Sequence, residues 1–415
     1  MILSSAIYLG SSLLNKAVPF LLLPLLTSYL TPAEYGTIAL FQMGVSLFIA
    51  LYGGLHLNIS RTYFKLDINN FSRLLTSIYL VLVSIWIFTT ILTTLYYFAG
   101  GTTFGLPQNW LLAMPIIAAM GMANLLNLTL LRSQERPLQY ARWEISHSII
   151  NMGISYLLVA HFLLGADGRM LGISIAILVF GTLGILRIIR TTPFQGRFSV
   201  EDTKQVIAIS LPLIPHVLSS VAITSIDLVF IRNYLGENAV GIYSIGYQFG
   251  MVVMLFSDAF LKAWQPWFFK TMDKATLHSK IAIVKGIWKF SLILAIGAFA
   301  WGILATLMLP YVADIRYIDA MHLILPISLS YIFFGWYQMV FPFLVYAGKT
   351  SSMAYITPLA ACINIGLNYL LIPKYGYSGA IIATALAYFF MFSLTFYAAN
   401  KYVKMPWIAK KQHII

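Results

Sequence analysis

Long apolar runs alternate along the whole chain with short connections that carry charged residues or Gly and Pro. A membrane-spanning helix needs about 20 predominantly apolar residues, and each of these runs is close to that length. The pattern therefore predicts twelve transmembrane helices. Six lie near residues 4–30, 36–60, 74–99, 110–131, 145–164 and 170–189, and six more near residues 205–231, 239–261, 290–309, 321–346, 354–372 and 379–399.

The composition indicates a membrane protein and excludes a soluble one. Of the 415 residues, 60% are hydrophobic and 9% are charged, whereas a soluble chain carries about 25% charged residues. The single cysteine, Cys362, lies within an apolar run, which excludes a disulfide framework, a zinc cluster and a thiol pair. We expect an all-α polytopic membrane protein that holds no metal and no cofactor. The first apolar run is too long for a cleaved signal peptide and is interpreted as the first helix.

The basic residues predict the orientation of these helices, because Lys and Arg concentrate in cytoplasmic connections. Most of the 26 basic residues fall in the even-numbered connections and in the C-terminal tail. The odd-numbered connections hold Arg169, Arg232, Arg316 and Lys374. Both termini are therefore expected in the cytoplasm. The net charge of +13 then reflects orientation, with anionic lipid headgroups as neighbours. It does not indicate nucleic-acid binding, because no basic cluster lies on a domain that is large enough to fold alone.

Segments of the two halves match each other at a slowly drifting offset. Residues 29–36 (Tyr-Leu-Thr-Pro-Ala-Glu-Tyr-Gly) align with residues 234–241 (Tyr-Leu-Gly-Glu-Asn-Ala-Val-Gly), and residues 151–158 align with residues 364–371. A duplication of six helices, an even number, gives two parallel repeats related by an axis along the membrane normal, with a central cleft between them. We expect an N-terminal lobe of residues 1–199, including the linker after helix six, and a C-terminal lobe of residues 200–415.

The first helix carries polar side chains on one face. Lys16 lies near its centre, and a rotation of 100° per residue places Ser12 and Asn15 on the same face. An ionisable side chain at mid-bilayer costs about 3 kcal/mol, so it is expected to face a cavity or a partner. We interpret Lys16, Asn15 and Ser12 as cleft residues that bind an anionic headgroup. A structural ion pair or a wet packing seam is the alternative.

The seventh helix carries a second polar face. His216, Ser220, Thr224 and Asp227 fall within one arc of this helix. Asp227 and His216 are candidates for exchanging a proton or binding a cation, and Ser220 and Thr224 are secondary cleft candidates.

Two further cleft candidates, Asp258 and Lys262, lie one turn apart at the end of the eighth helix, where mutual pairing at i, i+4 is the simpler explanation. Pro212 and Pro215 are expected to interrupt helix seven, and Pro19 and Pro24 to interrupt helix one.

Several motifs together resemble one family of transporters. Its second-half signature is similar to Leu-Pro-Leu-Ile-Pro-His at 211–216, followed by Asp227, Tyr-Leu-Gly at 234–236 and Val-Gly-Ile-Tyr-Ser at 240–244. Leu-Thr-Pro-Ala-Glu-Tyr-Gly at 30–36 resembles its first-half counterpart, and 263–266, 368–376 and 379–384 complete the likeness. The family is that of the Wzx-type polysaccharide lipid flippases in the multidrug/oligosaccharidyl-lipid/polysaccharide (MOP) exporter superfamily. The Asp of helix seven is commonly followed there by Arg, whereas Leu228 follows Asp227 here, so Arg232 is one candidate partner.

The resemblance implies a V-shaped transporter in the bacterial inner membrane. It implies that the cargo is an undecaprenyl-diphosphate-linked oligosaccharide, the repeat unit of an O-antigen or another surface polysaccharide, which moves from the cytoplasmic to the periplasmic leaflet. H⁺ or Na⁺ coupling and a polysaccharide polymerase partner are expectations of the same kind. One alternative is a multidrug/cation antiporter of the same superfamily, although Lys16 does not suit a cationic cargo. A polymerase or lipid-linked glycosyltransferase is disfavoured because the outer connections are short, so we expect a transporter and not an enzyme.

Overall fold

The computed structural model describes residues 7, 10, 11, 20–191, 199–274 and 276–407. The elements within these ranges are helices, and none of the residues described there forms a strand. The chain divides into two compact units. The first comprises residues 1–232 and 237–241, and the second comprises residues 233–236 and 242–415. The predicted all-α class is confirmed.

Within the part of the chain that the structure describes, ten helices are long and apolar enough to cross a membrane. The other two predicted spans, the first and the fifth, fall outside that set for different reasons. The continuous described part of the first is the short helix Phe20–Tyr29. The fifth corresponds to α6 (Pro137–Tyr156), whose 20 residues would reach about 30 Å, but Arg142 and Glu144 make its composition more polar. The protein is a multi-pass membrane protein.

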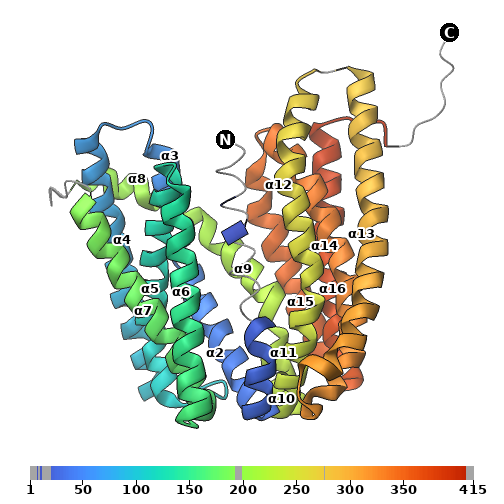
Figure 1. Ribbon diagram of the computed structural model, residues 1–415. Coiled ribbons are helices and arrows are strands. Elements are labelled where there is room, and N and C mark those ends of the chain that lie inside the picture. Colours follow the sequence, from blue (N-terminus) through green and yellow to red (C-terminus); the bar gives the residue numbers. More distant parts are fainter. Residues whose placement is uncertain (1–6, 8–9, 12–19, 192–198, 275, 408–415) are drawn as a thin grey trace. The chain divides into compact units, whose positions relative to one another are not determined.

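The first unit contains the helices from α2 to α9, most of α10 and the start of α11 (Figure 1). Its central helix is α5, which packs against α2, α4 and α7. Buried apolar side chains of α4 and α5, among them Phe71, Leu75 and Leu126, form the core between them. The elements are α2 (Pro32–Ala50), α3 (Leu57–Thr62), α4 (Ile68–Phe98), α5 (Gln108–Ser133), α6, the π-helix η1 (Leu157–His161), α7 (Gly165–Thr191), α8 (Val200–Ser210), η2 (Leu211–Leu213), α9 (Ile214–Ser225), α10 (Asp227–Leu235) as far as Arg232, and the first five residues of α11 (Glu237–Gly250).

The helix predicted over residues 36–60 is not continuous. Helix α2 ends at Ala50, and a series of turns precedes α3. Gly53 in this turn has a φ of +52°, and a Cβ atom there would lie 2.5 Å from the carbonyl oxygen of Ser210. Because both the left-handed backbone and the close approach require glycine, the break follows from local packing that hydropathy does not report.

The predicted interruption of helix seven at its prolines is confirmed. Pro212 lies in η2, a single 3-10 turn between α8 and α9, and Pro215 lies in the first turn of α9. A further break at Ile226 separates α9 from α10. Helix α8 belongs to the first unit, where Arg73 of α4 pairs with Asp202 at 2.5 Å. The predicted lobe boundary between residues 199 and 200 stays a prediction.

The second unit is built around α14, which packs against α12, α13 and α16, while α15 packs against α16 (Figure 1). Aromatic side chains such as Tyr331, Tyr388 and Phe343 fill its interior. Helices α12 and α13 extend beyond their predicted bounds into the lysine-rich connection, because charged residues continue a helix readily outside an apolar environment. The elements are the part of α11 (Glu237–Gly250) that follows Gly241, α12 (Val252–Met272), α13 (Leu277–Val312), η3 (Ile315–Ala320), α14 (Met321–Tyr346), η4 (Thr350–Ser352), α15 (Met353–Tyr375) and α16 (Tyr377–Tyr402).

Candidate transport site

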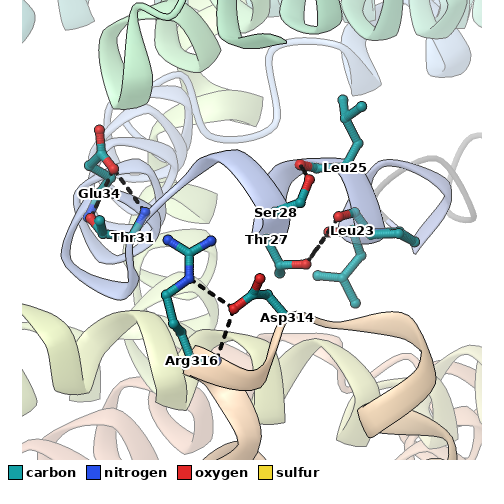
Figure 2. A network of polar contacts seen from close by, with 9 residues as sticks. Leu23, Leu25, Thr27, Ser28, Thr31, Glu34, Asp314 and Arg316 are labelled. Carbon is teal, nitrogen blue, oxygen red and sulfur yellow. Dashed lines mark hydrogen bonds and ion pairs between the residues drawn. The ribbon is translucent and has the colours of Figure 1, made fainter.

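The proposed anion-binding residues of helix one, Ser12, Asn15 and Lys16, lie outside the described residues. The described part of this helix keeps its hydroxyl groups satisfied locally. Thr27 Oγ1 donates to the carbonyl oxygen of Leu23 at 2.9 Å, and Ser28 Oγ donates to that of Leu25 at 2.8 Å (Figure 2). Hydroxyl groups that bond to the preceding turn are compatible with an apolar environment, so these two residues provide no site of their own.

The polar face of the seventh span lies on α9. The hydroxyl of Ser220 donates to the carbonyl oxygen of His216 at 2.9 Å, and that of Thr224 donates to the carbonyl oxygen of Ser220 at 3.1 Å. The side chain of His216 is half-buried. Both hydroxyls are thus satisfied within the helix, and the site roles of His216, Ser220 and Thr224 stay predictions.

Asp227 occupies the first position of α10, directly after the break at Ile226. Its side chain is 1% exposed, and the backbone N–H of Leu228 donates to its Oδ1 at 3.0 Å. The start of a helix stabilises a carboxylate through its unpaired N–H groups and its dipole. The candidate partner Arg232 instead donates from Nη2 to Glu237 Oε1 at 3.0 Å. An ion-coupling role for Asp227 therefore rests on its buried carboxylate and not on Arg232.

Asp258 and Lys262 do not form the i, i+4 pair that their spacing suggests. Among the described residues no ion pair joins them, and Lys262 is exposed. The carboxylate of Asp258 on α12 accepts a hydrogen bond from Gln338 Nε2 on α14 at 2.6 Å. Gln338 was missed by the sequence reasoning, although an amide inside the apolar run at residues 321–346 is a signal that could have identified it.

Arg169 is buried, contrary to its predicted place in an outer connection. Helix α7 begins at Gly165, so Arg169 lies in its second turn with 5% of its surface exposed. Its Nη1 donates to Asn151 Oδ1 at 2.6 Å and to Ser155 Oγ at 2.5 Å on α6. Removing a guanidinium from water is costly unless its donors are bonded, and α6 supplies these acceptors.

The equivalent positions of the second half also form a buried polar cluster. Asn151 and Ser155 correspond, at the offset of 213 residues, to Asn364 and Asn368. Both asparagines are fully buried on α15, and Asn368 Nδ2 donates to Asn364 Oδ1 at 3.1 Å. Asn364 Nδ2 in turn lies 3.4 Å from Thr384 Oγ1 on α16. Matched polar pairs in the two halves, in which Asn151 is half-buried and the other three residues are buried, agree with a duplicated chain.

A symmetric helix contact also supports the repeat. A Cβ atom on Gly36 would lie 2.6 Å from the carbonyl oxygen of Glu237, and one on Gly241 would be closer still to the carbonyl oxygen of Pro32. Gly36 aligns with Gly241, and Pro32 aligns with Glu237, at the same offset of 205 residues. Each copy of the matched motif therefore uses its glycine to accommodate the backbone of the other copy. Glycine at such a contact lets two helices approach closely within a membrane.

A charged pocket of about 450 Å³ lies in the first unit, beside residues 103–107 and 164–170. Glu34 closes a capping box with Thr31 at the start of α2, with its Oε2 accepting from the Thr31 N–H and hydroxyl, each at 2.8 Å (Figure 2). Trp110 Nε1 donates to Asp167 Oδ1 at 2.6 Å. The ends of α2, α7 and α10, the start of α11 and the loop at residues 103–107 meet to form this pocket. The pattern of single helices gave no signal for it, because it depends on which helix ends come together. Within the described part of the chain, no group of three or more His, Cys, Asp or Glu is arranged to hold a metal.

Together, the apolar helices and the two halves with matched contacts define a polytopic membrane protein, and comparisons with known proteins specify its fold. A multidrug resistance MATE family transporter of the MOP superfamily, in an inward-facing conformation, has a TM-score of 0.74 at 15% identity, covering 93% of this chain and 94% of that one. The lipid II flippase MurJ, in an inward closed conformation, has a TM-score of 0.72 at 14% identity, covering 96% and 88%. The fold is therefore that of the MOP superfamily transporters.

The family follows from the sequence match. Residues 3–272 match the model of the polysaccharide biosynthesis protein family, and the chain belongs to that family. "Lsg locus putative protein 1" of Haemophilus influenzae is 23% identical over 411 residues, which cover 93% of this chain and 96% of that protein. The resemblance to the Wzx-type members of the MOP superfamily is confirmed at the level of family and fold.

Proposed function

We propose that this protein is a flippase. Its cargo is an undecaprenyl-diphosphate-linked oligosaccharide, which it moves from the cytoplasmic to the periplasmic leaflet of the bacterial inner membrane by alternating access. The observation that carries the proposal is membership of the polysaccharide biosynthesis protein family in a chain with the fold of the MOP transporters. In this proposal both termini are cytoplasmic, the lobes of residues 1–199 and 200–415 rock against each other, and the cargo occupies the cleft between them.

The physical need for such a protein lies in the headgroup. Moving one hydroxyl from water into hydrocarbon without a hydrogen-bond partner costs about 4–8 kcal/mol, and an oligosaccharide carries many of them. A cleft that keeps the sugar hydrated removes most of this barrier, while the polyprenyl chain stays in the bilayer.

Lys16, with Asn15 and Ser12 on its face, is the proposed ligand of the diphosphate. An ammonium group gives a charge-assisted hydrogen bond to a phosphate oxygen. With the cell interior negative, outward movement of each uncompensated negative charge gains about 2.3 kcal/mol per 100 mV. The membrane potential therefore favours transport in the proposed direction.

Asp227 and His216 are the proposed coupling residues for H⁺ or Na⁺. The support is that Asp227 is a buried carboxylate at a break between two helices of a membrane span. Such a break provides backbone groups beside the carboxylate, an arrangement that suits an ion site in a transporter.

The test is a glycan display assay in a strain that lacks the chromosomal copy. We expect Lys16→Ala to lose surface glycan while its level in the membrane stays normal, and Lys16→Arg to retain part of the display. Undiminished glycan display by Lys16→Ala would refute the role of Lys16. The whole proposal is tested with purified protein in liposomes that carry a fluorescent polyprenyl-diphosphate glycan. Absence of protein-dependent flipping, together with export of cationic dyes, would instead establish the multidrug antiporter.

A further inference from the structure

An apolar groove runs along the first unit. Its cavity of about 480 Å³ is enclosed by α2, α4, α5 and α10 and by the segment at 104–106. The two threonines that line it, Thr89 and Thr93, donate their hydroxyls to carbonyl oxygens of their own helix at 2.8 Å. Because these polar atoms are satisfied within α4, the groove offers an apolar surface to any occupant.

The dimensions of the groove match one leaflet of a membrane. Along α2 and the residue that follows it, the groove extends from Leu40 to Leu51, a distance of eleven steps that spans about 16 Å at 1.5 Å per residue. The hydrocarbon core of a bilayer is about 30 Å thick, so one leaflet contributes about 15 Å. Leu92 on α4 lines the groove and is 48% exposed, and Ile91 beside it is 52% exposed. The groove is therefore continuous with the apolar, membrane-facing surface of α4.

The end wall of the groove is held in an unusual backbone conformation. Phe104 has a φ of +51°, which is uncommon for a residue other than glycine. Its ring stacks on that of Tyr96, with the ring centroids 6.5 Å apart and the planes at 5°. Both side chains line the groove. Such a conformation persists only where the surrounding structure maintains it, and here it places an aromatic wall across the end of the cavity.

The charged pocket described above adjoins this wall, because Leu106 lines both cavities. The charged residues among its described lining are Glu34, Asp167, Glu237 and Arg232, so the charge of the pocket is negative overall. The only side-chain acceptor that the described residues provide for Arg232 is Glu237, although a guanidinium carries five N–H donors. Carboxylates beside an arginine with donors to spare are complementary to an ammonium group that is linked to a phosphate.

We propose that the groove and the charged pocket together bind one zwitterionic phospholipid with a primary ammonium headgroup, of the phosphatidylethanolamine type. One hydrocarbon chain occupies the groove between α2 and α4, in the leaflet at that end of the protein. The ammonium group contacts Glu34 and Asp167, and the phosphate accepts hydrogen bonds from Arg232. This lipid is a resident of the first unit and is distinct from the anionic cargo.

The test uses the purified full-length protein in detergent, mixed with phosphatidylethanolamine, phosphatidylcholine or phosphatidylglycerol of identical acyl chains. Native mass spectrometry measures the retained lipid, and thermal unfolding measures the stabilisation. We expect phosphatidylethanolamine to be retained several-fold more than either other lipid. Thr93→Trp fills the groove and should reduce retention of all three lipids, whereas Ile91→Trp, on the same helix but outside the groove lining, should not.

A second variant separates headgroup recognition from the fit of the chain. Glu34→Gln combined with Asp167→Asn removes two negative charges, while glutamine can still close the capping box and asparagine can still accept from Trp110. This variant should keep its lipid but lose the preference for phosphatidylethanolamine. Equal retention of the three lipids by the native protein, a preference for phosphatidylglycerol, or an unchanged preference in this variant would each overturn the proposal.

Discussion

The contact between the two copies of the repeated motif makes a sharp prediction for Gly241→Ala. The first residues of α11, at 237–241, lie against the start of α2, and glycine provides the space on both sides. Real Cβ atoms are essentially never found within 3.0 Å of such a neighbour. A methyl group on Gly36 would need at least 0.4 Å of separation from its 2.6 Å approach to Glu237, and one on Gly241 would need more. Because the opposing atoms are backbone carbonyl oxygens, no side-chain rotation can relieve the overlap.

The expected magnitude is that of an overpacked contact. Extra carbon atoms in a well-packed interior typically cost about 1–3 kcal/mol. The two substitutions should not add, because a separation forced by one methyl group also makes room for the other. Gly297→Ala on α13 is the matched control, since nothing lies within 4 Å of the added methyl group. There alanine should stabilise the helix by about 0.5–1 kcal/mol through its lower conformational entropy in the unfolded chain.

The assay is thermal unfolding of purified variants in one detergent, followed by tryptophan fluorescence. We expect a lower midpoint for Gly36→Ala, a still lower one for Gly241→Ala, and a double variant close to Gly241→Ala alone. Gly297→Ala should unfold at or above the midpoint of the native protein. A midpoint for Gly241→Ala equal to that of the native protein, or a double variant with fully additive loss, would show that the glycine contact does not join the two motifs.

Three further predictions concern polar groups. Asn151→Ala removes a charge-assisted hydrogen bond from the buried Arg169 and should destabilise the protein by about 1.5–3 kcal/mol; a midpoint unchanged in the same unfolding assay would mean that the guanidinium finds another acceptor. Hydrogen bonds from Arg316 hold the pKa of Asp314 below its ordinary value of 3.8 (Figure 2), so this pair contributes stability above pH 3.8 that is lost as the pH falls through the lowered pKa. The difference in midpoint between the native protein and Asp314→Asn should therefore shrink in acid, and a difference independent of pH would contradict it. Asp227→Asn should abolish the dependence of transport on a pH or sodium gradient in liposomes, and an unaltered dependence would exclude Asp227 as the coupling residue.

The arrangement of apolar runs was sufficient to predict the fold class, because a chain in a membrane must satisfy its backbone groups within helices. It was not sufficient to predict the breaks. The break at Gly53 depends on contact with a residue more than 150 positions later, Ser210, and no local pattern contains that information. The break at Pro212 was predicted because proline removes a backbone donor wherever the chain folds.

The candidate site was predicted less completely than the fold, for a similar reason. Periodicity places side chains on a face of one helix, and it does so for His216 and Thr224, but it does not say which other helix that face meets. The spacing along the helix favours a pair between Asp258 and Lys262, whereas in the structure Asp258 accepts a hydrogen bond from Gln338 on α14. Helix bounds matter as well, because a start at Gly165 moves Arg169 from a connection into a buried position.

The duplicated halves keep backbone contacts in common while their buried polar chemistry differs. In the first half, Asn151 and a serine accept hydrogen bonds from a guanidinium. In the second half, Asn364 and Asn368 bond to each other and to a threonine. A guanidinium has no acceptor atoms, so its neighbours in a dry interior must offer oxygens, whereas an amide can donate and accept and so can pair with its own kind. The first pair therefore has to present oxygens to a guanidinium, whereas the second pair has to supply both donors and acceptors. Exchanging the pairs, with serine and asparagine traded between residues 155 and 368, should destabilise the second half more than the first, because Ser155→Asn still presents an oxygen to Arg169.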